Sequence, residues 1–455
     1  MTTDVSATVT NWKGSIVSHP ARIVRPTTVD EIVNVLSDPA TYPSPVRAVG
    51  SNHSTTRCAV AEGGTVIDMT GMDRIIEITG DSVTVQAGAL YIDVAKALEQ
   101  RGLQFYVNVE LGNLTVGSGS CGGTKDASMP GEFGQVASYA IGFTLVLPSG
   151  DVVRIGEEQP ELLRIVRSSY GLLGIVVQVT FRVRPLAAMS VQHVSYRLGE
   201  FLEQLPQLKA RKQSMMFFLM PFLDRVIVEY RQYHAGETAK PNRTVWRFRN
   251  WMWKTVSPGY GALVTKLMPV KSARYFLIDW FNYWVQRAMG LLLSSPNTSA
   301  ADQIIRYPER AGLSAYTFSI WAFPEADYPT ILAAYYRFCR DYYRDSGYRC
   351  NLANVGYRIA QDPSSLFSYS TDGTVMTLDP VSTGDPGWNA FLDAYNDFCS
   401  EHGGVPLFNQ TRGIRPDHAR RAFGARLDQF EEVRRRYDPE NRLLNDYFRA
   451  MLPAA

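Results

Sequence analysis

The chain has 455 residues, of which 45% are hydrophobic and 20% charged, and its 46 Lys and Arg nearly balance its 44 Asp and Glu. Single hydrophobic cores stop growing at about 250–300 residues, so this length predicts two or three domains with a large buried core. The formal charge of +2 does not favour a nucleic-acid-binding surface, and no polyanion partner is expected.

The first stretch of the chain, MTTDVSATVTNWKGS, lacks the basic segment and apolar run of a secretory signal. An uninterrupted apolar run of about 18 residues is also missing, so no membrane-spanning helix is expected. The cysteines are few, odd in number and scattered, which favours reduced thiols over a disulfide framework or a metal site. They are Cys58, Cys121, Cys339, Cys350 and Cys399. These features predict a cytoplasmic protein without a bound metal.

The first predicted helix spans residues 28–37, where Thr28 and Glu31 form a capping-box pattern. Apolar residues follow with the i, i+3, i+4, i+7 spacing of an amphipathic helix. Strands are predicted at 65–69, 83–87, 143–147 and 151–155, and residues 148–150 form a turn between the last two. This mixture of short helices and strands indicates the α+β class.

Residues 175–183 alternate between apolar and polar side chains, which predicts a strand with one face buried. After Pro185 the chain becomes richer in Tyr, Phe and Trp, which indicates a second domain. The tail at 416–451 is helical in pattern and should be interrupted at Asp438-Pro439. We therefore divide the chain into domains at 1–190 and 191–400 and a C-terminal segment at 401–455 that packs back on the first domain.

Two glycine-rich segments carry most of the chemical information, VRAVGSNHS (46–54) and LTVGSGSCGGTKDAS (114–128). Glycine lets a backbone approach a ligand closely, and short polar side chains next to it can surround a pyrophosphate without net positive charge. Two tight surface turns are the alternative interpretation. Neither segment has the pattern of a Walker loop or of a standard nicotinamide site.

In chain order these segments resemble the FAD-binding PCMH-type domain of vanillyl-alcohol oxidase, p-cresol methylhydroxylase, the sugar-lactone and alditol oxidases and the decaprenylphosphoryl-ribose oxidases. The resemblance is carried by PARIVRPTTVDEIV (20–33), VRAVGSNHS (46–54), TVIDMTGMDRI (65–75), VTVQAGA (83–89), LTVGSGSCGGT (114–124), SSYGLLGIVVQVTFRV (168–183) and YDPENRLLNDY (437–447). It implies a two-subdomain FAD-binding domain, followed by an α+β substrate domain.

The resemblance also implies which residues hold FAD. His53 stands where covalent members bond a histidine to the flavin, and a loop residue without a role is the alternative. Cys121 does not match the cysteine that makes a second covalent bond in the berberine-bridge type. The remaining implied cofactor-binding residues are Val49, Gly50, Ser51, Asn52, Ser54, Thr115, Gly117, Ser118, Ser120, Cys121, Gly123, Thr124, Gly174, Ile175 and Val176.

The substrate half departs from the lactone and alditol oxidases at the positions expected to carry catalysis. Arg358 keeps the second position of their Glu-x-Arg motif, but Gly356 replaces the glutamate, and Gln410 stands where they place a lysine. Lys125 follows Thr124 where many relatives have a histidine. We expect Lys125 and Arg358 to face the flavin, the lysine as a base or as a cation near the ring, and the arginine for charge stabilisation or substrate anchoring. Gln410 is the third catalytic candidate. Alternatively, the lysine reaches solvent and Arg358 pairs with Asp362.

The segment 246–295 interleaves five tryptophans with Lys and Arg. Packing in a domain core, contact with a membrane surface and a lid over a lipophilic substrate all fit this pattern. Peripheral membrane association therefore stays open beside the cytoplasmic location.

The expected function is that of an FAD-dependent oxidoreductase that takes hydride from a C–OH donor such as an alcohol, lactone, polyol-like or lipophilic metabolite. Electrons would pass to molecular oxygen or another acceptor. A flavin-dependent tailoring oxidase or cyclase is the alternative enzyme, and an FAD-retaining, lipid-associated protein without turnover is the alternative outside enzymes. The donor and the oligomeric state do not follow from the sequence.

Overall fold

The computed structural model describes residues 8–234, 239–309, 311–312 and 315–453. Its first part is a small parallel sheet. The helix predicted at 28–37 connects two of its strands. Thr28 accepts a hydrogen bond from the Glu31 amide at 3.3 Å, and Glu31 accepts one from the Thr28 amide at 3.2 Å, so the predicted capping box is confirmed. The elements are β3 (Arg22–Val24), β5 (Thr65–Asp68), β4 (Val46–Val49) and α1 (Val29–Ser37), preceded by the hairpin of β1 (Val9–Thr10) and β2 (Val17–Ser18).

A larger antiparallel sheet forms the second part of the N-terminal half. All the predicted strands are present, and the Leu147 amide donates to the Asp151 carbonyl at 2.8 Å in the predicted turn. In sheet order the strands are β10 (Val152–Gly156), β9 (Ala140–Val146), β11 (Ile175–Pro185), β7 (Ser82–Gln86) and β6 (Ile75–Ile78), and β8 (Leu103–Phe105) pairs with the end of β11. Helices α2 (Tyr91–Glu99), α3 (Val116–Cys121) and α4 (Pro160–Val166) connect them.

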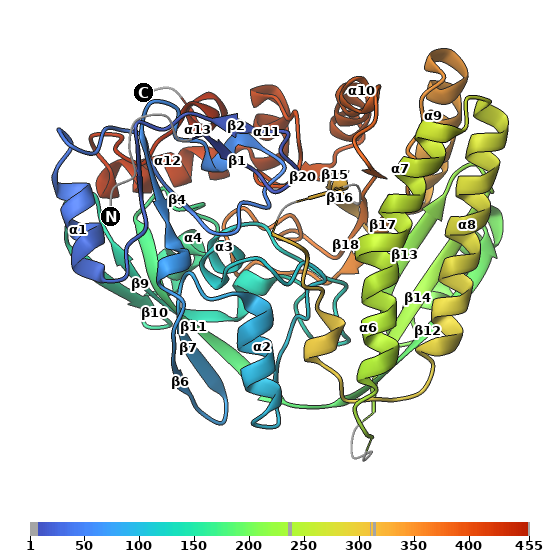
Figure 1. Cartoon of the computed structure of the whole chain (residues 1–455), viewed down its shortest axis with the longest axis horizontal. Helices are drawn as coiled ribbons and strands as arrows, with labels where there is room; N and C mark the ends of the chain where they lie inside the picture. Colours follow the sequence, from blue (N-terminus) through green and yellow to red (C-terminus); the bar gives the residue numbers. More distant parts are fainter. Residues whose placement is uncertain (1–7, 235–238, 310, 313–314, 454–455) are drawn as a thin grey trace.

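A seven-stranded sheet, here called the cap sheet, forms the second half of the molecule (Figure 1). Its strand order is β12 (Ala188–Arg197), β14 (Arg225–His234), β13 (Ser214–Met220), β17 (Asn354–Ile359), β18 (Val375–Leu378), β16 (Trp321–Pro324) and β20 (Val405–Pro406). A short pair, β15 (Thr317–Phe318) and β19 (Val381–Ser382), lies apart from it. The helices of this half are α5 (Leu198–Lys209), α6 (Arg243–Trp251), α7 (Ser257–Leu267), α8 (Lys271–Leu292), α9 (Tyr328–Ser346) and α10 (Trp388–Glu401).

Both faces of the cap sheet are covered. Along β13, Phe217 packs in the core that contains Tyr328 of α9, whereas Phe218 faces the other side and stacks on Trp253 at 5.4 Å. All seven residues of β13 are therefore buried, because successive side chains of a strand point to opposite faces. The second face is the one that lines the site described below.

Helices α6 and α7 follow each other end to end over that second face, and α8 lies beside them (Figure 1). A π-helical turn, Met252–Val256, joins α6 to α7. The tryptophans of this segment have different environments: Trp246 is buried, Trp253 is half-buried, and Trp251, Trp280 and Trp284 are exposed. In the described parts of the chain, none of the helices combines the length and the apolar character needed to cross a bilayer.

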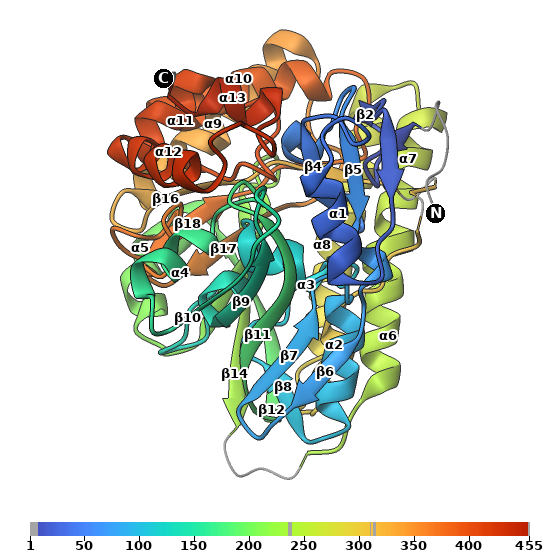
Figure 2. The ribbon, with the colours of Figure 1, turned by 90° about the vertical axis from the view of Figure 1, so that its left-hand side faces the viewer.

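The C-terminal helices return to the N-terminal half, where Figure 2 shows them beside β4 and α1. The Val46 amide donates to the Arg442 carbonyl at 2.8 Å, and the Arg442 guanidinium donates to the Val35 carbonyl at 2.8 Å. Asp438 accepts from the amides of Arg442 and Leu443, so it holds the turn that the Asp-Pro pair predicts. The helices are α11 (Pro416–Phe423), α12 (Ala425–Tyr437) and α13 (Asp446–Met451).

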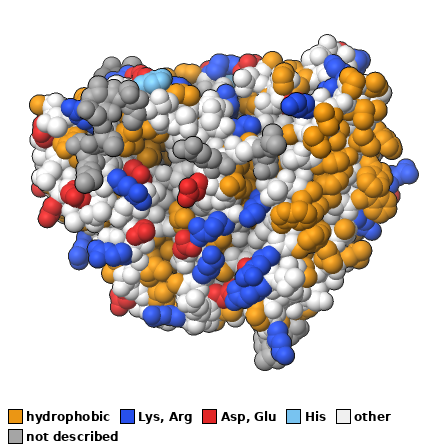
Figure 3. Space-filling model, viewed as in Figure 1, with side chains coloured by type: hydrophobic (Ala, Val, Ile, Leu, Met, Phe, Trp, Pro, Cys, Tyr) orange, Lys and Arg blue, Asp and Glu red, His pale blue; other side chains and the backbone are white. Residues whose placement is uncertain are grey.

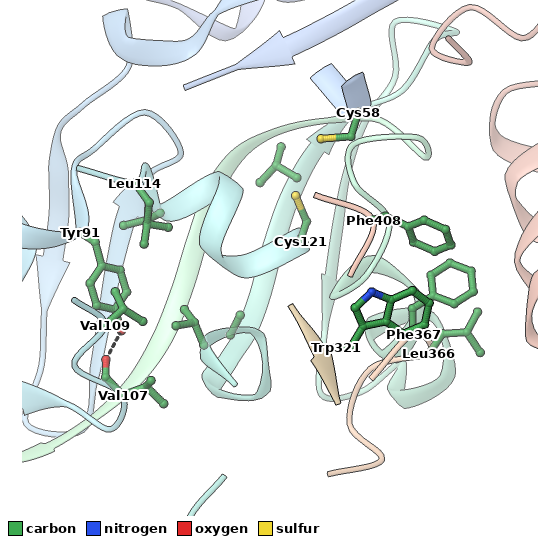
Figure 4. Packing of buried hydrophobic residues seen from close by; sticks show 14 of the residues in the cluster. Cys58, Tyr91, Val107, Val109, Leu114, Cys121, Trp321, Leu366, Phe367 and Phe408 are labelled. Carbon is green, nitrogen blue, oxygen red and sulfur yellow. Dashed lines mark hydrogen bonds between the residues drawn. The ribbon is translucent and has the colours of Figure 1, made fainter. Parts of the chain in front are cut away.

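One continuous hydrophobic core runs through both halves (Figure 4). On one side, Tyr91 of α2 packs in it and donates to the Val107 carbonyl at 2.8 Å. On the other, Phe367 and Phe408 of the second half pack with ring centres 5.3 Å apart. The short helix α3 lies between these groups, so its position is set by packing against both halves.

Candidate active site

A cavity of about 220 Å³ lies between the two halves. Three parts of the chain line it: the loop 48–54 that follows β4, the segment 109–126 that contains the start of α3, and the second face of the cap sheet with its helices. A smaller cavity of about 100 Å³ shares Gly50, Thr115 and Ser118 with the first and continues toward Gly117, Cys121 and Val176. The two predicted glycine-rich segments therefore form one continuous wall.

The loop 50–54 lies directly against the second glycine-rich segment. A Cβ atom at Gly50 would come within 2.2 Å of Thr115 Oγ1 and within 2.9 Å of its Cβ, so rotation of the threonine would not relieve the contact. Ser51 donates to the Asn113 carbonyl, and Asn52 adopts a left-handed backbone with φ of 52°. Glycine is needed at position 50 because the two segments touch there.

His53 points into a group of aromatic side chains. Its ring stacks on Trp12 at 5.2 Å between centroids and lies 6.5 Å from the ring of Tyr307. Burial lowers the pKa of His53 to about 4, because desolvation disfavours the imidazolium form. The ring is therefore neutral at neutral pH and has a lone pair available on one nitrogen.

Lys125 is buried at the cavity wall, and its side chain is only 4% exposed. Its Nζ lies 2.8 Å from Asp379 Oδ2 and 3.4 Å from the ring centre of Tyr357. Desolvation lowers the pKa of Lys125 and raises that of Asp379, and in both groups the ion pair opposes the shift. Asp379 Oδ1 has no hydrogen-bond partner among the described residues. The alternative expectation, a lysine that reaches solvent, is therefore wrong.

Arg358 meets neither sequence-based expectation, because it does not line the cavity and does not pair with Asp362. Its Nε lies 2.5 Å from Glu325 Oε1, while Asp362 instead accepts hydrogen bonds from other side chains. The reason is the alternation along β17, where Val355 and Tyr357 line the cavity and Arg358 points to the opposite face. Gly356 shares that opposite face. The glycine that stands here in place of the family's glutamate therefore removes no side chain from the cavity.

Gln410, which stands at the position of the family's lysine, lines the cavity, and its neighbour Asn409 lines it as well. Asn409 Nδ2 donates to the Gly123 carbonyl at 2.8 Å, and its Oδ1 is a buried acceptor without a partner among the described residues. The C-terminal stretch 403–413 therefore reaches across to the second glycine-rich segment.

The structure does not bring every expected cofactor-binding residue to the cavities. Ser120 is buried and donates to the Gly117 carbonyl at 2.9 Å, and Gly123 lies behind Asn409. Gly174 and Ile175 pack against β9 instead. The sequence did not single out five further wall residues, Asp379, Asn409, Tyr307, Tyr316 and Tyr357. Of these, Asn409 had a signal in its position next to Gln410. Trp253 also lines the wall and belongs to the aromatic segment 246–295, for which a lid over a substrate was one interpretation.

Two family descriptions together match most of the chain. Residues 20–156 match the family described as "FAD binding domain", and residues 179–451 match the family described as "D-arabinono-1,4-lactone oxidase". The first match contains both glycine-rich segments and Lys125, and the second contains the cap sheet, Asp379 and the C-terminal helices.

Individual related proteins match a smaller part of the chain than the two family descriptions do together. L-gulono-1,4-lactone dehydrogenase of Mycobacterium tuberculosis is 29% identical over 233 residues, which are 51% of this chain and 53% of that protein. L-gulonolactone oxidase of Bos taurus is 25% identical over 281 residues, which are 60% of this chain and 61% of that protein. The chain thus matches little more than half of the length of these relatives.

Among solved structures, a cholesterol oxidase from B. sterolicum superposes with a TM-score of 0.75. The match covers 99% of this chain and 98% of that one, at 13% sequence identity. This likeness establishes the α+β fold of both halves. At this level of identity, the likeness does not indicate which donor the chain oxidises.

Proposed function

The chain belongs to the D-arabinono-1,4-lactone oxidase family, and we propose that it is an FAD-dependent oxidoreductase that takes hydride from a C–OH group of a lactone- or polyol-type donor. One observation carries the proposal: the loop of His53, the second glycine-rich segment and the Lys125–Asp379 pair line a single cavity. That cavity thus combines a place for the cofactor with a charged pair for the donor.

The wall fits FAD in its chemistry. The glycines at 50 and 117 let the backbone approach closely, and Ser51, Thr115 and Ser118 supply uncharged polar groups suited to a pyrophosphate. Asn409 Oδ1 has no partner within the described part of the chain, so it can accept a hydrogen bond from a ligand N–H. We propose that these residues, with Val49, Asn52, Ser54, Cys121, Thr124 and Val176, hold the cofactor, which accepts the hydride when bound.

The Lys125–Asp379 pair would bind the donor hydroxyl and accept its proton. Asp379 Oδ1 is the acceptor available for the hydroxyl proton, because Oδ2 is already engaged by Lys125. The Lys125 ammonium favours the ionised form of this carboxylate, and it would stabilise negative charge on the donor oxygen as the hydroxyl proton leaves. Gln410 can orient the donor by hydrogen bonds, since an amide both donates and accepts.

We also propose that FAD is bonded covalently to His53. The low pKa leaves the ring neutral, as a nucleophile must be, and Trp12 fixes the plane of the ring by stacking. Acid precipitation should leave the yellow colour in the pellet, and the tryptic peptide that contains His53 should carry the flavin mass. Free FAD in the supernatant of fully loaded protein would exclude the bond.

The test of the reaction is anaerobic bleaching of the flavin absorbance. L-gulono-1,4-lactone, D-arabinono-1,4-lactone and open-chain polyols form the first panel, and at least one should reduce the flavin at a saturable rate. Readmission of air then separates an oxidase, which recovers its colour at once, from an enzyme that needs another acceptor. A fully loaded protein that no C–OH donor bleaches would contradict the proposal.

One observation favours a second class of donor. Apart from Lys125, Asp379 and Gln410, much of the wall that faces away from the glycine-rich segments is apolar or aromatic, for example Met216, Trp253, Phe318, Ile320 and Val355. Such a wall suits a donor with an apolar body more than a small sugar. Sterols and polyketide-like alcohols therefore form the second panel, and faster bleaching by these would assign the chain to lipophilic donors.

A further inference from the structure

The outer face of α6–α8 exposes an unusual concentration of large apolar side chains, which Figure 3 shows as a patch over α7 and α8. Among the described residues, 16 large hydrophobic side chains are exposed, and 10 of them lie between Phe248 and Leu292. Scattered exposed apolar residues are ordinary, but a contiguous patch of this kind marks an interaction site. We call this patch the apolar face.

The apolar face follows from the spacing of residues along α8. Phe276, Trp280 and Trp284 recur at intervals of four and are 66%, 55% and 53% exposed. Tyr275, Ile278, Asn282, Gln286 and Met289 occupy the opposite side of the helix and are buried. The helix therefore has a complete buried side toward the cap sheet, and the exposed side is not needed for that packing.

The segment that carries the apolar face is rich in cations, although Arg243, Arg247 and Arg249 at its start pair with carboxylates of other segments. Residues 243–292 contain eight Lys and Arg but a single acidic residue, Asp279, although the whole chain is nearly balanced. Asp279 is held by Arg349 in an ion pair. Lys266 and Arg287 are exposed and have no carboxylate partner among the described residues. The segment thus presents cations beside exposed tryptophan and phenylalanine.

We propose that this face docks on the surface of an anionic lipid bilayer, with α7 and α8 lying along the headgroups. Tryptophan rings favour the boundary between headgroups and acyl chains, and lysine and arginine favour anionic headgroups. A second copy of the chain fits less well, because a two-fold contact would bring the two cationic segments together. The charged residues along α8 keep the helix at the surface, and they are Lys271, Arg274, Asp279 and Arg287.

The proposal does not depend on the oxidation of any particular donor. It does place the membrane on one side of a helical layer and the cavity on the other, since Trp253, Pro258 and Asn282 of the same segment line the cavity. Binding to vesicles can therefore be measured without substrate, and a failure of binding is distinguishable from a failure of bleaching.

The test is flotation of the FAD-loaded full chain with vesicles of phosphatidylcholine alone, or of phosphatidylcholine and phosphatidylglycerol in equal parts. The wild type should float with the mixed vesicles, and added salt should weaken the binding. The double variant Trp280→Ser/Trp284→Ser should lower the partition coefficient at least about tenfold, because two large apolar side chains no longer enter the interface. Lys266→Glu/Arg287→Glu should remove the preference for phosphatidylglycerol.

Ile76→Ser/Val152→Ser is the matched control, since it also removes two exposed apolar side chains, but from the sheet of the N-terminal half. It should float like the wild type, and all variants should keep the flavin spectrum. No flotation of the wild type with either vesicle, or equal flotation of all variants, would overturn the proposal. So would a dimer in sedimentation velocity that Trp280→Ser/Trp284→Ser dissociates, because the face would then be an interface between copies.

Discussion

At the level of single residues, the feature with the largest chemical consequence is the buried pair of Lys125 and Asp379. Both side chains are at most 4% exposed, so each would be costly to keep charged without the other. Nearby Tyr357 offers its ring face to the ammonium, which compensates part of the lost hydration. Because Oδ1 of Asp379 is left without a partner among the described residues, the pair retains an acceptor for a donor hydroxyl.

The first prediction concerns the rate of flavin reduction in variants of this pair. Lys125→Met and Asp379→Asn should each slow anaerobic single-turnover reduction at least about tenfold, the scale of one lost electrostatic contact in a water-excluded site. Arg358→Met is the control, because its side chain faces away from the cavity and pairs with Glu325. If Arg358→Met slows reduction as much as Lys125→Met does, the assignment of the pair is wrong.

The second prediction concerns the pH dependence of flavin reduction. Reduction should be fast over a narrower pH range than an ordinary carboxyl group and an ordinary lysine would give. Burial raises the pKa of Asp379, so on acidification the proton acceptor is lost at a higher pH than for an ordinary carboxyl group. Burial lowers the pKa of Lys125, so on alkalinisation the cation is lost at a lower pH than for an ordinary lysine. Because the two groups interact, both limbs report the pair.

Stopped-flow reduction across the pH range checks this profile. Asp379→Asn should flatten the acid limb, and Lys125→Met should flatten the alkaline limb. Wild-type limbs at the ordinary pKa values of a carboxyl group and a lysine would contradict the assignment.

At the level of elements, the packing of the loop 50–54 against α3 leads to a prediction about cofactor retention. Gly50→Ala would place a methyl group 2.2 Å from Thr115 Oγ1, so the loop that carries His53 must move away from the glycine-rich segment. The variant should purify with less FAD than the wild type, measured as the absorbance ratio of flavin to protein. Gly80→Ala is the control, because no atom lies within 4 Å of its new Cβ. Equal flavin content in both variants would show that the loop adapts.

The elements also show where the sequence was informative. The helix at 28–37 has its own start signal, and the strand at 175–183 alternates because one face is more polar, so both could be predicted. The strand β13, SMMFFLM, could not, because both of its faces are buried and no alternation remains. The same holds for the site. Residues within contiguous motifs, such as Gly50 and Ser51, could be predicted from the sequence. Asp379 and Trp253 reach the cavity through strand pairing and helix packing, which sequence patterns do not encode.

At the level of the whole molecule, the C-terminal segment ties the two ends of the chain together. The Arg442 guanidinium donates to the carbonyls of Val35 and Leu36 at the end of α1 and to Ser44 Oγ. Arg442→Met would leave buried acceptors unpaired and should lower the free energy of unfolding by about 2–4 kcal/mol. Arg436→Met, which removes an exposed pair with Glu432, should change it by less than about 0.5 kcal/mol. Urea unfolding monitored by flavin fluorescence measures both, and equal midpoints would contradict the role of Arg442.

The position of this segment also determines when the N-terminal unit can complete its folding during translation. Arg47 of β4, next to the flavin loop, donates to the Leu443 carbonyl at 3.0 Å, and Asn445 donates to the Cys58 carbonyl at 3.1 Å. Domains generally fold as they leave the ribosome, N-terminal first. Here the N-terminal unit lacks these partners until residues 442–445 have been translated. A nascent chain stalled after Tyr437 should therefore be open to protease within residues 46–60. The released chain should resist cleavage there only once residues 438–451 have docked.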